Sequence, residues 1–250
     1  MRGEDIAEHE SDFDTNRVDS LGKPHNLSQQ RIRIPGEDSF MDYVRVRPAS
    51  GDESYFYRSR YDKDQIVLHY TMGYFKGDIG TLTQPDYHVS VPFVVGRNGM
   101  IYNLFFSGFW TYHLGPGAIG GNQVRSRRTI GNELSNIGGL RRTDQGVATY
   151  YGDIYCDIDQ AQYYQEESFR RIDHYATFTG AQYDALIVLL RYLTARYDIP
   201  RGVLPEEMRY QTDRDVLEFR GIVTHVNYRP SGKENIGPAF DWDRIIAGIA

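Results

Sequence analysis

Two histidines of this 250-residue chain each follow a short apolar run. His69 ends the run Ile-Val-Leu-His, and His225 ends Gly-Ile-Val-Thr-His. Such runs are typical of strands buried on both faces, and the last residue lies at the edge of the sheet. If the two strands are neighbours, the imidazoles meet, and neutral imidazole is the commonest zinc ligand. The spacing alone leaves open a shared metal site or two histidines with structural roles.

Strands and helices alternate in the part of the chain that must position these histidines. Asn98-Gly99 lies between two apolar stretches, which is a strong β-hairpin signal. Residues 179–197 have apolar side chains at helical spacing behind a capping box of Thr179 and Gln182. Further strands are predicted at 65–68, 127–138 and 221–225, and a short last helix near 240–246. Together these elements predict an α/β fold.

The composition excludes several classes of protein. The net charge of −6 gives no reason to expect a nucleic-acid partner. Cys156 is the single cysteine, so no intramolecular disulfide is expected. No apolar stretch is long enough for a membrane span, and the first residues lack the apolar core of a secretory signal. We therefore expect synthesis in the cytoplasm, followed by release or export through another route.

The ends of the chain and one internal segment are expected to differ from this core. Residues 1–37 are acidic and polar, which predicts a mobile arm or a segment that orders on a partner. Residues 40–60 alternate around Pro48–Gly51, as in a hairpin or edge strand. We therefore divide the chain into an N-terminal extension, 1–60, and a main domain, 61–250. Residues 140–175 are predicted to be an insertion, without a predicted structure.

Six motifs occur in an order that resembles a known family. They are LHYT, RNGMIYNLF, WTYHLG, TIGNELSN, FTGAQYDAL and the segment from THVN to GPAFDW. In this order they resemble the type 2 N-acetylmuramoyl-L-alanine amidases, a superfamily shared with peptidoglycan recognition proteins and small phage amidase lysozymes. The resemblance covers roughly residues 64–246. It implies a central mixed β-sheet flanked by helices, with a zinc ion in a groove on the sheet.

The resemblance also implies roles for individual residues. His69 and His225 match the first two zinc ligands, and Glu133 matches the catalytic glutamate, a carboxylate suited to take a proton from water. Lys233 matches a lysine that would stabilise an oxyanion. Four further residues are expected to contact substrate: Tyr70, Trp110, His113 and Arg229. Trp110 and His113 have an alternative role in packing the core.

Two positions depart from the family pattern. The third zinc ligand is Asp or Cys in the family, whereas this chain has Asn235. A neutral amide oxygen is a weaker ligand than a carboxylate or thiolate. Asn235 itself, the neighbouring Glu234, or no residue could therefore complete the site, and we expect Asn235 to do so. Many relatives also have a His or Tyr where this chain has Val91-Pro92-Phe93, which places more weight on Glu133.

These observations predict a zinc-dependent peptidoglycan amidase that cleaves the bond between N-acetylmuramic acid and L-alanine. A phage lysin, a virion-associated lysin or an exported effector would have this activity without a signal peptide. The alternatives are a non-catalytic peptidoglycan-binding module, favoured by Asn235, and a structural component of a phage or injection particle. In the last case residues 1–60 would bind a particle partner.

Overall fold

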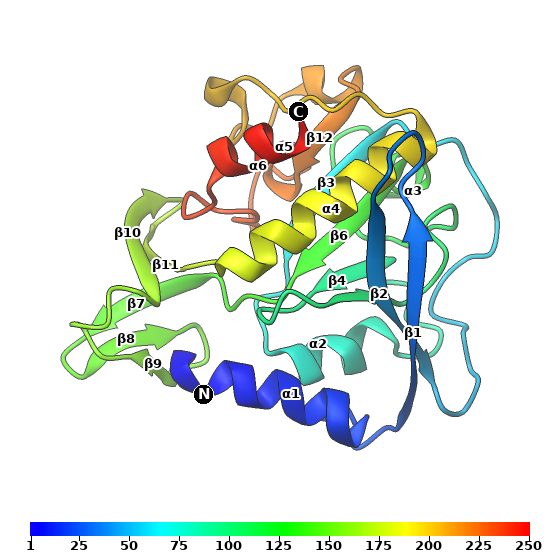
Figure 1. Ribbon diagram of the computed structural model, residues 1–250. Helices are drawn as coiled ribbons and strands as arrows, with labels where there is room; N and C mark the ends of the chain where they lie inside the picture. The colour runs from blue at the N-terminus through cyan, green and yellow to red at the C-terminus, as the bar shows by residue number, and fades with distance from the viewer.

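A seven-stranded mixed sheet forms the centre of the computed structural model, which describes residues 1–250 (Figure 1). Only the pairs β1–β2 and β4–β5 are antiparallel. In spatial order the strands are β1 (His25–Arg33), β2 (Phe40–Pro48), β5 (Ile101–Asn103), β4 (Phe93–Val95), β6 (Thr129–Leu134), β3 (Gln65–Tyr70) and β12 (Gly221–Thr224). The predicted α/β architecture with a central mixed sheet is confirmed.

The parallel strands β6, β3 and β12 bring the predicted chemistry together. β3 lies between the other two, with Leu68 opposite Thr224 on one side and His69 opposite Glu133 on the other. Residues in register across neighbouring strands share a face of the sheet. His225 directly follows β12 as the first residue of the one-turn helix α5 (His225–Tyr228). Both histidines and Glu133 therefore lie at the carboxyl-terminal ends of these three parallel strands.

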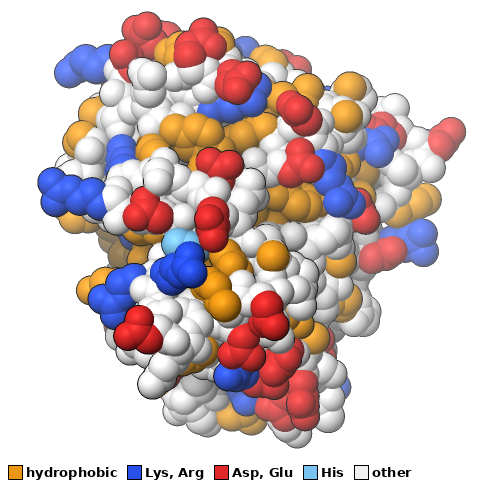
Figure 2. All heavy atoms as spheres, turned by 90° about the vertical axis from the view of Figure 1, so that its left-hand side faces the viewer, with side chains coloured by type: hydrophobic (Ala, Val, Ile, Leu, Met, Phe, Trp, Pro, Cys, Tyr) orange, Lys and Arg blue, Asp and Glu red, His pale blue; other side chains and the backbone are white.

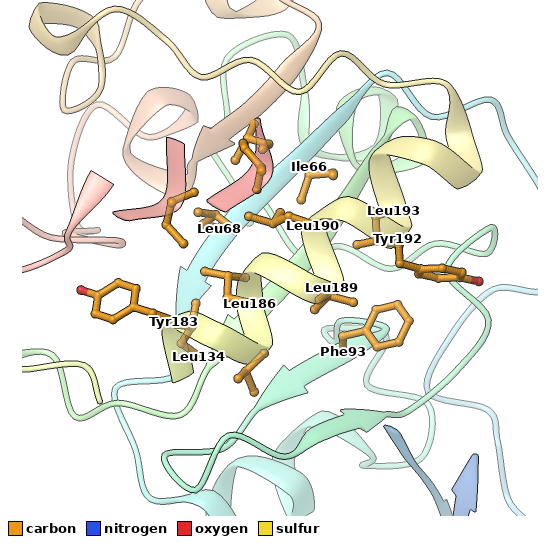
Figure 3. Packing of buried hydrophobic residues seen from close by; sticks show 14 of the residues in the cluster. Ile66, Leu68, Phe93, Leu134, Tyr183, Leu186, Leu189, Leu190, Tyr192 and Leu193 are labelled. Carbon is orange, nitrogen blue, oxygen red and sulfur yellow. The ribbon is translucent and has the colours of Figure 1, made fainter. Parts of the chain in front are cut away.

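One face of the sheet is covered by α4 (Gly180–Tyr197) and α6 (Trp242–Ile249). Both halves of the predicted Thr179–Gln182 capping box are present at the start of α4. Figure 3 shows the leucines of α4 over β3 and β6. The buried contact joins Leu186, Leu189, Leu190 and Leu193 to Ile66, Leu68 and Leu134. His69 and Glu133 alternate along their strands with members of this apolar layer, so their side chains point to the other face of the sheet.

The opposite face carries α1 (Ile6–Asn16) and α2 (Phe75–Leu82). Phe13 of α1 stacks edge-on against Phe75 of α2, and both side chains are fully buried. The remaining short helices lie in connecting segments, and one of them directly precedes α1. They are α3 (Asn122–Arg128) and the 3-10 helices η1 (Gly3–Asp5), η2 (Glu206–Met208) and η3 (Arg214–Leu217). None of the helices combines the length and apolar character needed to cross a bilayer.

The expectation of a mobile N-terminal arm is wrong. Residues 1–37 contain α1 and β1, and β1 pairs with β2 over nine residues. Ile6 and Phe13 are buried one above the other on α1, and between them Glu10 accepts hydrogen bonds of 2.9 Å from the backbone N–H groups of Arg97 and Asn98. These few apolar residues are sufficient to pack α1 onto the domain because they lie on one face of the helix. The average composition of the segment does not show such a face.

The expected hairpin around Pro48–Gly51 is also corrected. Residues 40–48 do form a strand, but its partner is β1 on the N-terminal side, and residues 54–60 contain no strand. β2 is therefore an internal strand of the main sheet, and β1 is the edge. Because both strands are hydrogen-bonded into the seven-stranded sheet, residues 1–60 are structurally continuous with the rest.

The predicted insertion forms a second, antiparallel sheet of five strands. In spatial order they are β10 (Tyr164–Phe169), β11 (Ile172–Ala176), β7 (Gly139–Thr143), β8 (Gly146–Thr149) and β9 (Ile154–Cys156). This sheet lies beside the end of α1 in Figure 1. Arg2 pairs with Asp157 at 3.0 Å, and a Cβ at Gly3 would lie 3.0 Å from the ring of Tyr163. The N-terminus and the insertion are thus packed against each other.

Candidate metal centre and active site

Three buried histidines contact one another at the edge of the main sheet. Nδ1 of His69 lies 2.9 Å from Nδ1 of His225, and Nε2 of His69 lies 3.1 Å from Nδ1 of His113. Each of the three side chains is less than a tenth exposed. The expected meeting of His69 and His225 is therefore present in the structure, with His113 behind His69.

The hydrogen-bond chain behind His69 assigns its protons. The hydroxyl of Thr129 donates to the carbonyl of Arg125 at 2.9 Å, so its oxygen accepts from Nε2–H of His113 at 2.8 Å. His113 is neutral because burial lowers its pKa well below the usual value, so its Nδ1 has a lone pair and accepts from Nε2–H of His69. The Nδ1 atom of His69 is then left with a free lone pair.

His225 is oriented in the same way from the other side. Its Nε2–H donates to the carbonyl of Leu114 at 2.9 Å, which leaves a lone pair on Nδ1. The two lone pairs thus face each other across 2.9 Å. Burial, with a contribution from the Lys233 ammonium, lowers the pKa of both rings, that of His225 to about 3. A shared proton is disfavoured at neutral pH, so the arrangement suits a metal ion held by both Nδ1 atoms.

Asn235 contacts the residue that follows each histidine, Tyr70 after His69 and Val226 after His225, and it has an unpartnered oxygen. Its Nδ2 donates to the carbonyl of Tyr70 at 2.6 Å, and its backbone carbonyl accepts from the N–H of Val226 at 3.0 Å. Because a carbonyl can only accept, the first bond assigns the amide orientation and leaves Oδ1 buried without a partner. No three His, Cys, Asp or Glu side chains are grouped to hold a metal ion. The Oδ1 atom of Asn235 therefore adds a free oxygen atom to the two Nδ1 lone pairs.

Glu133 lies at the wall of a cavity of about 480 Å³, which also borders Asp78 of α2 and His9 of α1. Its Oε2 is buried without a hydrogen-bond partner. Burial and the nearby Asp78 carboxyl raise the pKa of Glu133 to about 8, against the opposing effect of Lys233. A carboxyl with a pKa near neutrality can take up and release a proton at physiological pH.

Lys233 belongs to the loop that ends in Asn235. Its positive charge lowers the pKa values of His69, His225 and Glu133. Its backbone carbonyl accepts a hydrogen bond from Arg170, at the turn between β10 and β11, and the same guanidinium donates to the carbonyl of Arg229. The second sheet therefore holds the loop that carries Lys233 and Asn235.

A family model described as N-acetylmuramoyl-L-alanine amidase matches residues 59–237. The chain belongs to this amidase family. The match begins at residue 59, so α1, β1 and β2 lie outside it, whereas the five-stranded sheet lies within it.

Two relatives illustrate the range of similarity within the amidases. The amidase AmiD of Escherichia coli (strain K12) is 27% identical over 185 residues, covering 72% of this chain and 51% of AmiD. The chain thus spans about half the length of that curated relative. A solved complex of the E. coli AmiD with anhydro-N-acetylmuramic acid-L-Ala-D-γ-Glu-L-Lys has a TM-score of 0.50 at 23% identity, covering 76% and 59% of the two chains. A solved AmpD derivative has a TM-score of 0.49 at 19% identity, covering 82% and 93%.

The four residues expected to contact substrate in this amidase lie in different surroundings. His113 is buried, and its Nδ1 contacts Nε2 of His69, so it does not line an open groove. Trp110 is buried between Tyr57, stacked at 4.3 Å, and Arg127, which lies 4.7 Å over the ring. Trp110 therefore has the packing role that the sequence left open, whereas His113 hydrogen-bonds His69. Arg229 is half-buried, donates to the carbonyl of Leu114 at 3.3 Å, and stays a predicted substrate contact.

The expectation for Tyr70 is corrected by the structure. Tyr70 follows His69 in β3, so the two side chains point to opposite faces of the sheet. The Tyr70 side chain is 2% exposed, belongs to the core beneath α4, and is covered by Gly138. Only its backbone carbonyl reaches the site, where it orients Asn235.

Two residues near the site were missed by the sequence interpretation. Asp78 occupies an inward position of α2, in the same stripe as Phe75, Ile79 and Leu82, and a carboxyl at an apolar position is a detectable signal. Thr129, which orients His113, has no local signal. Its role depends on a contact between segments that are distant in sequence.

Proposed function

We propose that this amidase hydrolyses the bond between N-acetylmuramic acid and the L-alanine of a peptidoglycan stem peptide, and that it requires zinc. The observation that carries the proposal is the pair of facing Nδ1 lone pairs on His69 and His225. Neutral imidazole nitrogens are preferred zinc ligands, and catalytic zinc sites use three protein ligands. The unpartnered Oδ1 of Asn235 is the proposed third ligand.

When bound, zinc would supply Lewis-acid polarisation of the scissile carbonyl and would acidify a water molecule. Glu133 would take the proton of the attacking water at Oε2 and return it to the nitrogen of the leaving L-alanine. Its raised pKa, about 8, supports this exchange near neutral pH. The Lys233 ammonium would stabilise the negative charge that develops on the carbonyl oxygen.

Three residues outside the reacting groups would keep this arrangement in place. The chain from His113 through Thr129 to a backbone carbonyl holds the proton on Nε2 of His69, which keeps its Nδ1 available. Arg170 would hold the Lys233 loop through the Lys233 carbonyl. Such outer contacts orient ligands and raise metal affinity.

Release of new amino-terminal alanine from peptidoglycan tests this proposal. The purified protein with added zinc should release it, as a known amidase does under the same conditions. Glu133→Gln should retain zinc but lose at least about 100-fold of the rate, in line with the usual contribution of a general base. Glu207→Gln, at an exposed position, is the matched control. Absence of alanine release by the zinc-loaded wild type would overturn the proposal.

A non-catalytic peptidoglycan-binding module is the second candidate, and Asn235 favours it. An amide oxygen brings no charge to the metal site, so zinc affinity would be low. This candidate predicts a protein that binds cell walls, purifies without stoichiometric zinc and releases no alanine. Metal analysis of the purified protein, together with wall digestion, separates the two functions.

A role as a phage lysin, virion-associated lysin or exported effector stays a proposal about where the amidase acts. The proposed particle partner depended on a mobile N-terminal arm. Because α1 and β1 pack onto the domain, that support is lost. Co-purification with particle proteins would be needed to restore it.

A further inference from the structure

A second cavity, of about 730 Å³, lies on the five-stranded sheet next to the proposed active site. Residues of β7, the end of β8, β11 and the turn between β10 and β11 line it, together with Gly232 and Glu234. We call it the arginine cavity, because four of its lining residues are Arg141, Arg142, Arg170 and Arg171. Figure 2 views the side of the molecule that carries this sheet, where Lys and Arg side chains gather at mid-height beside a histidine.

The charge of these arginines is not balanced within the protein. None of the four has a carboxylate within 4.0 Å, whereas other arginines, such as Arg191 and Arg201, form ion pairs with Glu37. Asp173 and Glu234 are the only acidic residues that line the cavity, so arginines outnumber carboxylates there in a chain of net charge −6. Unpaired guanidinium groups around a concave surface are suited to bind carboxylates in a bidentate manner.

His174 gives a second, independent indication of a ligand. It lines the same cavity, is 9% exposed, and its Nε2 atom has no hydrogen-bond partner. The nearest carboxylate, that of Glu166, lies 3.7 Å away, beyond hydrogen-bond distance. Buried polar atoms in proteins nearly always have a partner, so an unpartnered one at a cavity wall indicates a group that binds there.

The turn between β10 and β11 supports the same conclusion. Arg170 and Arg171 form a two-residue hairpin turn in which both have positive φ angles, 50° and 70°. Such turns usually contain Asn-Gly, because other side chains are strained in this conformation. Two arginines at these positions are better explained by the use of their side chains than by turn formation.

The arginine cavity is close enough to serve the same substrate as the active site. Its lining residues Gly232 and Glu234 flank Lys233 in the sequence, and Arg170 contacts the Lys233 backbone directly. An extended tripeptide spans about 10 Å, which allows a stem peptide to reach from one site into the other. Within a muramoyl peptide, the γ-linked glutamate has a free α-carboxylate and the C-terminus has another, while the sugar ring is uncharged.

We propose that the arginine cavity binds the carboxylates of the stem peptide and makes the amidase prefer a free α-carboxylate on the second residue. This specificity rests on the amidase function proposed above. The guanidinium groups of Arg141, Arg142 and Arg171 bind the carboxylates, and Nε2 of His174 forms a hydrogen bond with the same peptide. Amidation of that carboxylate removes the charge while keeping its shape, so it is the chemical change to which the cavity responds.

Two substrates test the proposal: N-acetylmuramoyl-L-Ala-D-γ-Glu-L-Lys, and the same molecule with the glutamate α-carboxylate amidated. The wild type should show a kcat/KM at least about tenfold higher for the acid, as expected for one charge-assisted contact. Arg171→Gln and the double variant Arg141→Gln/Arg142→Gln should bring this ratio towards one. Arg45→Gln, an exposed arginine on β2, is the matched control and should keep the wild-type ratio. Circular dichroism of each variant checks that it is folded.

Binding of the tripeptide L-Ala-D-γ-Glu-L-Lys, measured by calorimetry, separates the two proposals. If no substrate is hydrolysed but the peptide binds and the Arg171→Gln variant binds it at least about tenfold more weakly, the amidase proposal fails and the cavity retains its ligand. If both substrates are hydrolysed equally by the wild type, or the variants lose both activities equally, the cavity proposal is overturned. Tripeptide binding that the arginine variants leave unchanged overturns it as well.

Discussion

The buried carboxyl of Asp78 predicts that Asp78→Asn stabilises this amidase at alkaline pH. Asp78 is 8% exposed, and burial raises its pKa from 3.8 to about 7, although Ser135 donates a hydrogen bond to it. Between these two pH values the native protein holds a proton that the unfolded chain has released. The free energy of unfolding therefore decreases as pH rises, by about 1.4 kcal/mol per pH unit.

A shift of about three pH units corresponds to a loss of roughly 4 kcal/mol in the free energy of unfolding between pH 4 and pH 8. Asparagine cannot ionise, and its amide oxygen can still accept the hydrogen bond from Ser135. Asp78→Asn should therefore equal the wild type in stability near pH 4 and exceed it by about 4 kcal/mol at pH 8.

Urea unfolding followed by circular dichroism, at several pH values from 4 to 8.5, provides the measurement. A chelator keeps the protein free of metal, so that only the side chains contribute. Asp144→Asn, in the exposed turn between β7 and β8, is the control and should follow the wild-type curve. Parallel curves for Asp78→Asn and the wild type would mean that Asp78 titrates normally, and the reasoning from burial would be refuted.

The same substitution has a consequence for activity. The Asp78 carboxyl is the second cause, after burial, of the raised pKa of Glu133. Asp78→Asn should therefore lower the pKa of Glu133 and move the acidic limb of the pH–rate profile to lower pH. If the acidic limb of the profile stays at the same pH in Asp78→Asn, Asp78 does not influence the function of Glu133.

Three further predictions concern the metal site and the N-terminus. In competition with a chromophoric chelator, Asn235→Ala should weaken zinc binding by at least about tenfold and Asn235→Asp should strengthen it, since a carboxylate adds charge; equal affinities for both variants would exclude Asn235 as a ligand. Thr129→Val removes the acceptor that orients His113 and should weaken zinc binding by about 10- to 100-fold, while the exposed Thr15→Val should have no effect. Phe13→Ala should lower the free energy of unfolding by about 3–5 kcal/mol, and a loss below about 1 kcal/mol in urea unfolding would contradict the packing of α1.

Local signals explain which parts of the fold and site could be predicted. The apolar runs before His69 and His225 indicated buried strands, and the capping box before α4 marked the start of the longest helix. Each histidine ends a short apolar run, so the two were expected to be adjacent if the two strands were parallel neighbours. The proposals that Asn235 is the third ligand and that Glu133 is the general base depended on family resemblance, because neither residue has a signal of its own.

Contacts between distant segments explain what could not be predicted. His113 reaches His69 across 44 positions of sequence, and neither residue type nor spacing reports that meeting. The N-terminal region was misjudged because averaged polarity obscured a single buried face with Ile6, Glu10 and Phe13. The five-stranded sheet was not foreseen because β8 and β9 have only four and three residues, and because β10 is largely polar, with Tyr164 as its one buried residue.

The contact between the N-terminus and the five-stranded sheet limits how this amidase could be recombined with others. A Cβ at Gly3 would meet Tyr155 as well as Tyr163, and the Tyr74 hydroxyl, from the loop before α2, donates to the carbonyl of Met1 at 2.9 Å. Neither segment is therefore an independent cassette. A chimera that received the sheet without residues 1–16 would expose these aromatic rings to water, so the two segments must be exchanged as one unit.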